Sequence, residues 1–484
     1  MISDAAHRTV PALLARAAEH YADRPALSDE HDTVSFGALA TRVARAAAAL
    51  AAAGIGHGDR VAVVLPSSTA FVEATLGVLA AGAAAFPITA AARPAELRRL
   101  LAATPVAGLV APTDVVAALP AEGAALVPEP GGLAVARRRR AAPAAAAPAP
   151  GDPALAAYSS GTVAPPHLVV RTHENLWWEA ENLASATGFD PTDVVLGIVP
   201  LSHAHGFGNA LLASLRAGAH LIVRPRFHRR QTLELLERAR VTVFPTVPFV
   251  VRMLATGSRG RRCDLGALRW CVSAGAPLAR DVFDAFHDRF GVRVRQLYGL
   301  TEAGSVTLNA APAETLDPAS VGTPLGTTRV TVEDADGRAL PAGAEGEVVV
   351  WSAAAAGGAA APLRTRDRGV LDAAGALRVT GRTSLFINSA GNKVDPAEVE
   401  RVLGEHPAVA EAAVFGVPAP HGEELVAAAV VLRAPCGADA LRLHCRSQMA
   451  AYKVPRLIRV RRALPRSPLG KVLIGRLIAE AAGD

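Results

Sequence analysis

Apolar residues recur along this chain with two spacings that alternate. Residues 9–22 and 71–81 have the three-to-four-residue spacing of helices, whereas residues 59–66 form a short apolar run of strand length. Alternating strands and helices predict a parallel sheet covered by helices on both faces. The same alternation continues in four further apolar runs, 193–199, 219–223, 241–244 and 268–273, and in two helical stretches, 231–240 and 281–290.

The pattern changes in the last third of the chain. Short strands separated by turns, at 329–337 and 346–351, predict a small antiparallel, barrel-like part. An expected strand at 408–417 and a basic, helix-rich tail predict a separate α+β lobe. We therefore expect an α/β protein: a large N-terminal lobe of mixed and parallel sheets, residues 1–382, followed by a small mobile C-terminal lobe, residues 383–484.

Composition narrows the class of protein. The chain has 484 residues, a length that exceeds one average domain, and 51% of the residues are hydrophobic, which is enough to form a core in each domain. Pro and Gly interrupt each apolar run before it reaches the length of a membrane span, so we expect none. The first residues lack the apolar segment of a secretory signal, which favours a cytoplasmic location. Four cysteines without close pairing are expected to be free thiols.

The charge argues against a nucleic-acid partner. The formal charge of +6 is small for this length, and only 4% of the residues are aromatic, without any repeated basic-aromatic pattern. The densest basic run, Arg137 to Arg140, precedes an Ala-Pro stretch, and we interpret both as a solvated surface loop, with anion docking by the basic run as the alternative.

A cluster of hydroxyl residues and glycine follows an apolar run at residues 158–167, YSSGTVAPPH. Hydroxyls and backbone N–H groups can surround an anion, and glycine permits the tight curvature that this requires. The spacing is not that of a Walker loop, so phosphoryl transfer of the kinase or GTPase type is disfavoured. The candidate phosphate ligands are Ser159, Ser160, Gly161, Thr162 and His167. A plain turn remains the alternative.

Residues 298–302, YGLTE, and Lys471 are the most informative positions. A hydroxyl and a carboxylate beside a turn-forming glycine can hold a nucleotide and its metal ion. A lysine after a glycine-containing loop can meet the junction of a carboxylate and a phosphate. Alone, each segment is compatible with an ordinary turn or helix entry; together they predict a carboxylate-activating enzyme.

The order of the motifs resembles that of the adenylate-forming superfamily, which contains acyl-CoA synthetases, peptide-synthetase adenylation domains and beetle luciferases. The resemblance covers nearly the whole chain. It implies a two-step reaction in which a carboxylate and Mg-ATP give an acyl-adenylate and pyrophosphate, and a thiol then displaces AMP. The matching segments are 158–167, 200–203, 273–278, 298–302, 364–367, 380–382, 389–393 and 465–471.

The resemblance also implies roles for individual residues. Glu302 is the expected Mg2+ ligand, with Thr162, and Thr301 the expected contact to the α-phosphate. Asp367 would accept hydrogen bonds from the ribose hydroxyls, and Lys471 on the mobile lobe would stabilise charge during adenylation. Arg382 is expected at ribose or phosphate oxygens, and Lys393 in a loop presented for the thioester step. The remaining nucleotide positions are Tyr298, Gly299, Gly275, Ala276 and Pro277.

Several positions depart from the family pattern. Val163, Ala164 and His167 replace a hydroxyl, a glycine and a lysine of the phosphate loop, Arg366 stands where glycine is usual, and Leu385 replaces an acid at the expected hinge. The departures leave slow or altered adenylation open, and also a non-catalytic nucleotide-binding relative.

The substrate is expected to be a carboxylic acid without an α-amine, fatty or aryl, because the segment around Ala204 offers no acid to pair an ammonium group. Coenzyme A is the favoured acceptor, and the phosphopantetheine of a carrier protein is the alternative. We expect a monomer or homodimer. His203 and His205 lack a third ligand at metal spacing, so neither is expected to bind zinc. The expected pocket wall consists of His203, Phe244, Val247, Phe249 and Gly275, and His203 is also an expected catalytic residue, with Lys471, Glu302 and Thr301.

Overall fold

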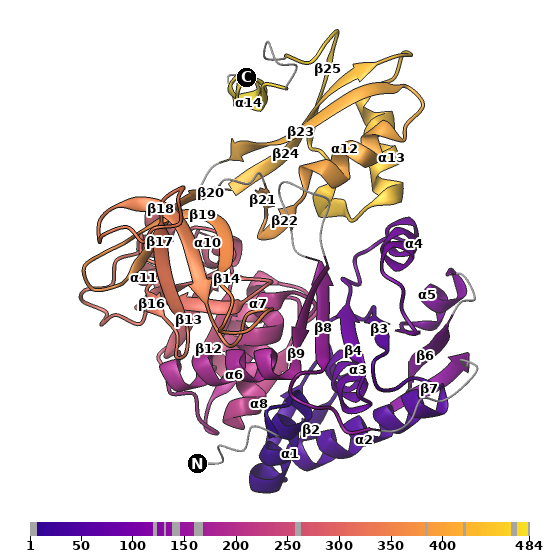
Figure 1. Ribbon diagram of the computed structural model, residues 1–484, viewed down its shortest axis with the longest axis vertical. Coiled ribbons are helices and arrows are strands. Elements are labelled where there is room, and N and C mark those ends of the chain that lie inside the picture. The colour runs from indigo at the N-terminus through magenta and orange to yellow at the C-terminus, as the bar shows by residue number, and fades with distance from the viewer. Residues whose placement is uncertain are drawn as a thin grey trace. The chain divides into compact units, whose positions relative to one another are not determined.

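The computed structural model describes residues 7–119, 123–129, 132–137, 146–158, 168–256, 263–382, 386–419, 423–465 and 472–482, with the backbone alone at residue 382. The chain divides into two compact units (Figure 1). The first contains the residues up to Ala90 together with Thr104–Ala157 and Leu168–Gly381; the second contains Ala91–Ala103 and the residues from Arg382 onward. A functional boundary between residues 382 and 383 stays a prediction.

A nine-stranded sheet is the larger sheet in the described part of the first unit. Its central strands are parallel, and β14 turns back antiparallel into β15, which places a tight turn at the carboxyl end of β14. In spatial order the strands are β16 (Thr323–Pro324), β15 (Gly304–Leu308), β14 (Val294–Leu300), β13 (Trp270–Ala274), β12 (Val243–Thr246), β10 (Val194–Gly197), β11 (His220–Val223), β1 (Pro25–Ser28) and β2 (Thr33–Ser35).

A second, seven-stranded sheet belongs to the same unit. Strand β3 is parallel to β4 and β5, β5 is parallel to β6, and β7 folds back antiparallel on β6. Its order is β7 (Gly132–Arg137), β6 (Ala124–Glu129), β5 (Gly108–Val110), β3 (Arg60–Val63), β4 (Ala84–Pro87), β8 (Pro153–Tyr158) and β9 (Leu168–Thr172). The predicted parallel sheets covered by helices are confirmed.

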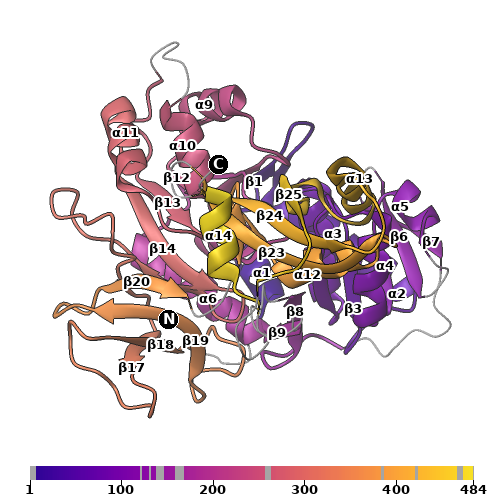
Figure 2. The ribbon, with the colours of Figure 1, turned by 90° about the horizontal axis from the view of Figure 1, so that it is seen from above.

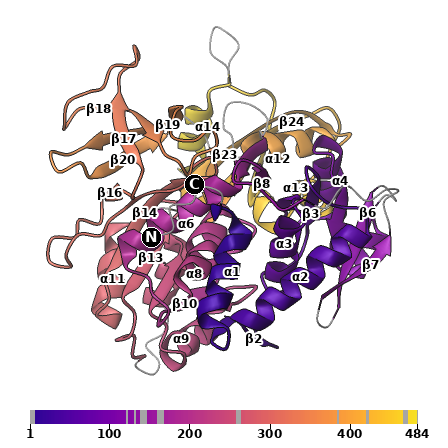
Figure 3. The same cartoon turned by 60° about the horizontal axis from the view of Figure 1, so that its bottom comes forward.

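The helices of this unit start at side-chain caps that the sequence supplies. Thr9, Ser35, Ser68 and Thr172 each accept a hydrogen bond from a backbone N–H of the first turn. Figure 3 shows α1, α2 and α3 side by side. The helices are α1 (Val10–Tyr21), α2 (Phe36–Ala52), α3 (Thr69–Ala80), α5 (Thr113–Ala117), α6 (His173–Thr187), α7 (Ala204–Gly206), α8 (Ala213–Ala217), α9 (Arg229–Arg238), α10 (Pro248–Thr256) and α11 (Arg280–Phe290), with a π-helical segment at Phe207–Leu212.

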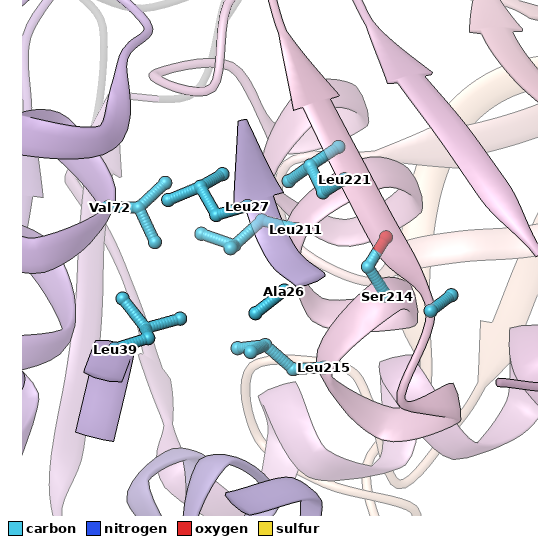
Figure 4. Close-up of a pocket in the computed structure, with 9 residues that line it drawn as sticks. Ala26, Leu27, Leu39, Val72, Leu211, Ser214, Leu215 and Leu221 are labelled. Atoms are coloured by element: carbon cyan, nitrogen blue, oxygen red, sulfur yellow. The ribbon is translucent and has the colours of Figure 1, made fainter. Parts of the chain in front are cut away.

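A small cavity lies in the core of this unit (Figure 4). Its wall is apolar except for Ser214, whose Oγ is buried without a hydrogen-bond partner. The cavity carries no titratable group, so we interpret it as a packing gap. The lining residues are Ala26, Leu27, Leu39, Val72, Leu211, Ser214, Leu215, Ala219 and Leu221.

The predicted antiparallel part is a four-stranded sheet. Val348 and Val350 are fully buried in one hydrophobic cluster with Tyr298 and Ala303, which flank the β14–β15 turn. This cluster fixes the small sheet against that turn. The strands are β17 (Arg329–Glu333), β18 (Glu345–Trp351), β19 (Leu363–Leu371) and β20 (Leu377–Arg382).

The second unit has its own core around a three-stranded sheet, β23-β24-β25, that is covered by helices. Figure 2 shows α12 beside β23, and α14 also contacts β23. Lys453 Nζ lies 2.5 Å from Glu96 of α4 and 2.9 Å from Glu398 of α12. The elements are α4 (Pro94–Ala103), β21 (Ile387–Ser389), β22 (Asn392–Val394), α12 (Pro396–Gly404), β23 (Val409–Ala419), β24 (Glu423–Leu432), α13 (Ala438–Gln448), a 3-10 turn at Ala451–Lys453, β25 (Leu457–Arg461) and α14 (Ile474–Ala482).

None of the helices in the described ranges is long and apolar enough to cross a membrane. The expectation for the cysteines is confirmed, since Cys263, Cys271, Cys436 and Cys445 are all free.

Candidate functional site

The turn between β14 and β15 presents Thr301 and Glu302 at the carboxyl end of β14. A Cβ at Gly299 would lie 2.6 Å from the carbonyl oxygen of Gly304, and Gly304 itself has φ +66°, so the tight turn requires glycine at both positions. The carbonyl of Glu302 accepts a hydrogen bond from Ala356 N over 2.7 Å. This contact fixes the backbone that carries the Glu302 side chain. The half-buried carboxylate of Glu302 provides acceptor oxygens at the turn.

Tyr298 and Asp367 form a buried pair next to this turn. The Tyr298 hydroxyl donates to Asp367 Oδ2 over 2.5 Å, and the two residues are only 8% and 1% exposed. Asp367 N also donates to Thr365 Oγ1 over 3.1 Å. An ionised carboxylate is an acceptor only, and these contacts hold its acceptor oxygens in a fixed orientation.

Asp367 owes its position to an irregularity in β19. Across the β18–β19 ladder, Val349 pairs with Arg364 and Glu347 pairs with Arg368, so β19 has extra residues between these pairs. Such bulges redirect side chains. Arg366, inside the bulge, has φ +60°, a conformation that favours glycine, and its side chain is exposed.

The loop after β13 places Gly275, Ala276 and Pro277 at the carboxyl end of a parallel strand, where open α/β sheets bind ligands. Gly275 has φ +90°, and a Cβ there would meet nothing within 4 Å. Gly275 and Pro277 are exposed. The end of the loop is fixed by Leu278 N, which donates to Gln296 Oε1 over 2.9 Å.

A buried hydrogen-bond chain links α7 to β15. His205 Nε2 contacts Thr246 O over 2.9 Å, and Asn209 Nδ2 donates to His205 Nδ1 over 2.6 Å. Ser305 Oγ donates to Asn209 Oδ1 over 2.5 Å. Because Nδ1 accepts, Nε2 carries the proton of the neutral imidazole. Burial of the imidazole lowers the pKa of His205 to about 4. Part of the residue is accessible, but both ring nitrogens are engaged in the hydrogen-bond chain.

A buried ion pair joins β9 to α6, next to Gly208 and Gly304. Arg171 Nη1 is 2.6 Å from Glu179 Oε2, and each side chain is 2% exposed. Arg171 also donates to Ala354 O over 2.8 Å. A Cβ at Gly208 or Gly304 would come within 1.9 Å or 2.3 Å of the Glu179 carboxyl group, so the glycines leave the space that this carboxylate fills.

The expected pocket residues differ from one another in their exposure to solvent. His203 is exposed at the start of α7, and Val247 and Phe249 are half-buried. Phe249 packs edge-on against Phe227. Phe244 is fully buried in the core formed with α10 and α11. Its side chain is not accessible to a ligand, in contrast to the prediction that it lines a pocket.

The structure does not test the remaining predicted site residues. Lys393 belongs to the second unit, on β22, with Nζ 6.0 Å from the ring centroid of Phe386. Arg382 ends β20, and its side chain is not described. Those outside the described residues are Ser159, Ser160, Gly161, Thr162, His167 and Lys471.

Sequence reasoning missed Arg171, Glu179, Asn209 and Ser305. The available signal was the pair of glycines at 206 and 208, which implies close packing of backbone. The described residues contain no group of three or more His, Cys, Asp or Glu side chains that could hold a metal ion.

Comparisons with known proteins find two matching family models and similar proteins over nearly the whole chain. Residues 14–358 match the model of the AMP-binding enzyme family, and residues 398–471 match the AMP-binding enzyme C-terminal domain. A sulfoacetate–CoA ligase of Cupriavidus necator is 34% identical, with 96% of each chain covered. A feruloyl-CoA synthase of an Amycolatopsis species is 32% identical over 91% of this chain and 93% of its own.

A solved structure is similar over the full fold. The structure of an amide bond synthetase from Marinactinospora thermotolerans has a TM-score of 0.82 and 28% identity, covering 97% of this chain and 99% of its own.

Proposed function

The chain belongs to the AMP-binding enzyme family, and from this premise we propose that it activates a carboxylic acid without an α-amine and transfers the acyl group to coenzyme A. It is an AMP-forming acid–CoA ligase that uses ATP. The observation that carries the assignment of the site is the buried Tyr298–Asp367 pair beside the turn that presents Thr301 and Glu302.

The first half-reaction needs an oriented nucleotide. A carboxylate oxygen attacks the α-phosphorus, a P–O bond to the acyl group forms, and the bond to pyrophosphate breaks. We assign Asp367 to the ribose hydroxyls because its carboxylate is held rigidly by Tyr298. Thr301 is assigned to the α-phosphate, and the exposed loop from Gly275 to Pro277 to the adenine side, because a Cβ at Gly275 would meet nothing within 4 Å.

The chemistry at Glu302 fits Mg2+. A half-buried carboxylate at a turn, in a chain whose described residues contain no group of three or more His, Cys, Asp or Glu side chains that could hold a metal ion, suits an ion that keeps water and phosphate ligands. Glu302, together with Thr162, would hold the ion, which neutralises phosphate charge when bound. The chain's own contribution is to orient the nucleotide and to supply the cation of Lys471 where carboxylate and phosphate meet.

In the second half-reaction the sulfur of the thiol attacks the acyl carbonyl, AMP leaves, and the thiol proton is released. We assign Lys393 to the loop that is presented to the site during thioester formation. We also assign residues 1–382 to the large lobe and residues 383–484 to the small mobile lobe. ATP and coenzyme A are both available in the cytoplasm, which is where we place the reaction, with the enzyme acting as a monomer or homodimer.

The acid side lies at α7. Residues 200–208 contain no acidic residue that would pair an ammonium group, and the exposed His203 starts the helix. Relatives that act on sulfoacetate and ferulate support an acid without an α-amine. We therefore propose a fatty or aryl acid, with His203, Val247 and Phe249 next to it.

Product analysis tests this proposal. The purified chain is incubated with Mg-ATP, a panel of short anionic, aryl, fatty and amino acids, and either coenzyme A, a carrier protein with its phosphopantetheine, or an amine. We expect acid-dependent pyrophosphate release and the mass of an acyl-CoA. The amine is included because the amide bond synthetase neighbour forms another kind of bond. Exclusive loading of carrier protein or amide formation would overturn the acceptor, and ATP binding without pyrophosphate release for any acid would indicate a non-catalytic relative.

A further inference from the structure

Three arginines alternate along β19, and they differ in their partners. Arg364 Nη2 lies 2.8 Å from Glu333 Oε2 and its Nη1 2.6 Å from Glu347 Oε2, while Arg368 Nε lies 3.4 Å from Glu345 Oε1. Arg366 lies between them. In the described part of the chain its guanidinium has no ion pair or side-chain hydrogen bond, and only its backbone N–H contacts Glu347 Oε1, over 3.2 Å. One cation of the row is therefore available.

The backbone at Arg366 is held in a costly conformation. Two other described non-glycine residues have positive φ: Arg240, which follows the C-terminal end of α9, and Ala390, in the turn between β21 and β22. Those are ordinary places for a left-handed residue. Arg366 instead lies inside a strand, with φ +60°. Glycine would adopt this conformation without strain, so the arginine side chain is kept against a conformational cost.

Arg366 is adjacent in sequence to a residue of the candidate nucleotide site. Arg366 directly precedes Asp367, which is bonded to Tyr298 on the strand that leads to Thr301 and Glu302. Asp367 and Glu302 both bring negative charge to this site, and a nucleotide polyphosphate adds more. A permanent, exposed cation at this point lowers the electrostatic cost of bringing the polyphosphate to two carboxylates.

We propose that the guanidinium of Arg366 binds a phosphate of the nucleotide, and that the left-handed bulge of β19 serves to direct it there. The inference rests on the proposed function, because it takes the Asp367 site as the nucleotide site. It adds a contact that distinguishes the polyphosphate from the nucleoside.

Binding of Mg-ATP and of adenosine to the intact chain without acid tests the proposal. Four proteins are compared by calorimetry: wild type, Arg366→Gln, Arg366→Gly, and Arg368→Gln as the matched control, which removes the same charge two positions away. We expect Arg366→Gln to weaken Mg-ATP binding about 5- to 20-fold, the usual effect of losing one charge-assisted hydrogen bond, and adenosine binding less than about twofold. Arg368→Gln should change neither affinity by more than about twofold.

Arg366→Gly separates strain from charge. It should weaken Mg-ATP binding as Arg366→Gln does, yet raise the melting temperature of the nucleotide-free protein above that of Arg366→Gln, because glycine accepts the left-handed backbone. The loss in Mg-ATP affinity should also shrink as salt is added.

Two results would overturn the inference. Unchanged Mg-ATP affinity in Arg366→Gln would exclude a phosphate contact, and an equal loss for Mg-ATP and adenosine would move the contact to the ribose or base. In either case wild-type ATP binding and acid-dependent pyrophosphate release would leave the proposed function intact. Failure of the wild type to bind Mg-ATP would instead refute the nucleotide site itself.

Discussion

The hydroxyl of Tyr298 donates a hydrogen bond to Oδ2 of Asp367, a residue 69 positions later, over 2.5 Å. The bond joins the β14–β15 turn to the small antiparallel sheet and fixes the orientation of a carboxylate that is only 1% exposed. Residues distant in sequence are thereby held as one rigid element of the candidate site.

Tyr298→Phe should weaken nucleotide binding and lower stability together. Removing a hydrogen bond to a buried charged acceptor costs about 1–3 kcal/mol in the free energy of unfolding. Chemical denaturation and the KM for ATP measure the two effects. Tyr21→Phe is the control, because the Tyr21 ring packs against Phe36 at 6.4 Å in the same unit, distant in sequence from the turn. Equal losses in both variants would argue against a special role for the Tyr298 hydroxyl.

Gly304→Ala should destabilise the protein severely. The new Cβ would lie 2.3 Å from the Glu179 carboxyl carbon, in a backbone with φ +66°, and we expect a loss of about 3 kcal/mol or more. Gly188→Ala is a matched control with φ +63° and nothing within 4 Å, so it should cost only about 1 kcal/mol of left-handed strain. Urea titration of both variants measures the difference, and similar values would show that Glu179 moves aside.

His173 should make the protein sensitive to acid. Its side chain is fully buried, Nδ1 accepts from Val10 N over 3.3 Å, and burial lowers its pKa to about 4 from 6.5, against the opposing charge of Asp152. The unfolded chain therefore binds the proton first. The stability linked to His173 is complete above about pH 6.5 and is lost as the pH falls toward 4, with a slope of at most about 1.4 kcal/mol per pH unit.

Unfolding free energies measured from pH 7 to pH 4.5 test this assignment. His173→Gln should flatten the decline relative to wild type, whereas the same change at the exposed His31 should leave the slope as it is. Parallel curves for all three proteins would remove His173 as the source.

Lys471→Ala should abolish formation of the acyl-adenylate while thioester formation from supplied acyl-adenylate continues. Loss of a cation that stabilises the transition state costs about 3 kcal/mol or more, roughly a hundredfold or greater loss in rate. Lys393→Ala is expected to show the opposite selectivity. Separate assays of pyrophosphate release and acyl-CoA formation decide, and equal losses of both steps in each variant would contradict a division of the steps between two lysines.

Glu302→Gln keeps the shape of the side chain and removes its charge. We expect the Mg2+ concentration for half-maximal activity to rise, because a neutral amide is a weaker ligand for a hard cation. A titration of activity with Mg2+ measures this shift, and an unchanged midpoint would remove Glu302 from the metal site.

Local patterns were sufficient to predict much of the fold. The strand at 193–199 and the helix at 281–290 correspond to β10 and α11, because short apolar runs and helical spacing report directly on burial. The position of Glu302 in a turn followed from the motif around Gly299. Such features depend on neighbours in sequence.

Features that depend on distant partners were not predicted. The contact of Arg171 with Ala354 joins residues 183 positions apart, and no local pattern reports it. Phe244 is expected in a pocket wall but is fully buried in a core cluster, because its place near a motif in the sequence does not report whether its side chain is accessible. The extra residues of β19 around Arg366 likewise appear only when the β18 register is known.

The space filled by the Glu179 carboxylate has an evolutionary consequence. Gly208 and Gly304 both border it, so a substitution at either glycine is tolerated only after position 179 has become smaller. If Glu179 were shortened first, the buried charge of Arg171, its partner at 2.6 Å, would be left unpaired. The four positions therefore form an epistatic set in which each single step is disfavoured, and divergent descendants of this chain should retain all four residues or replace them together.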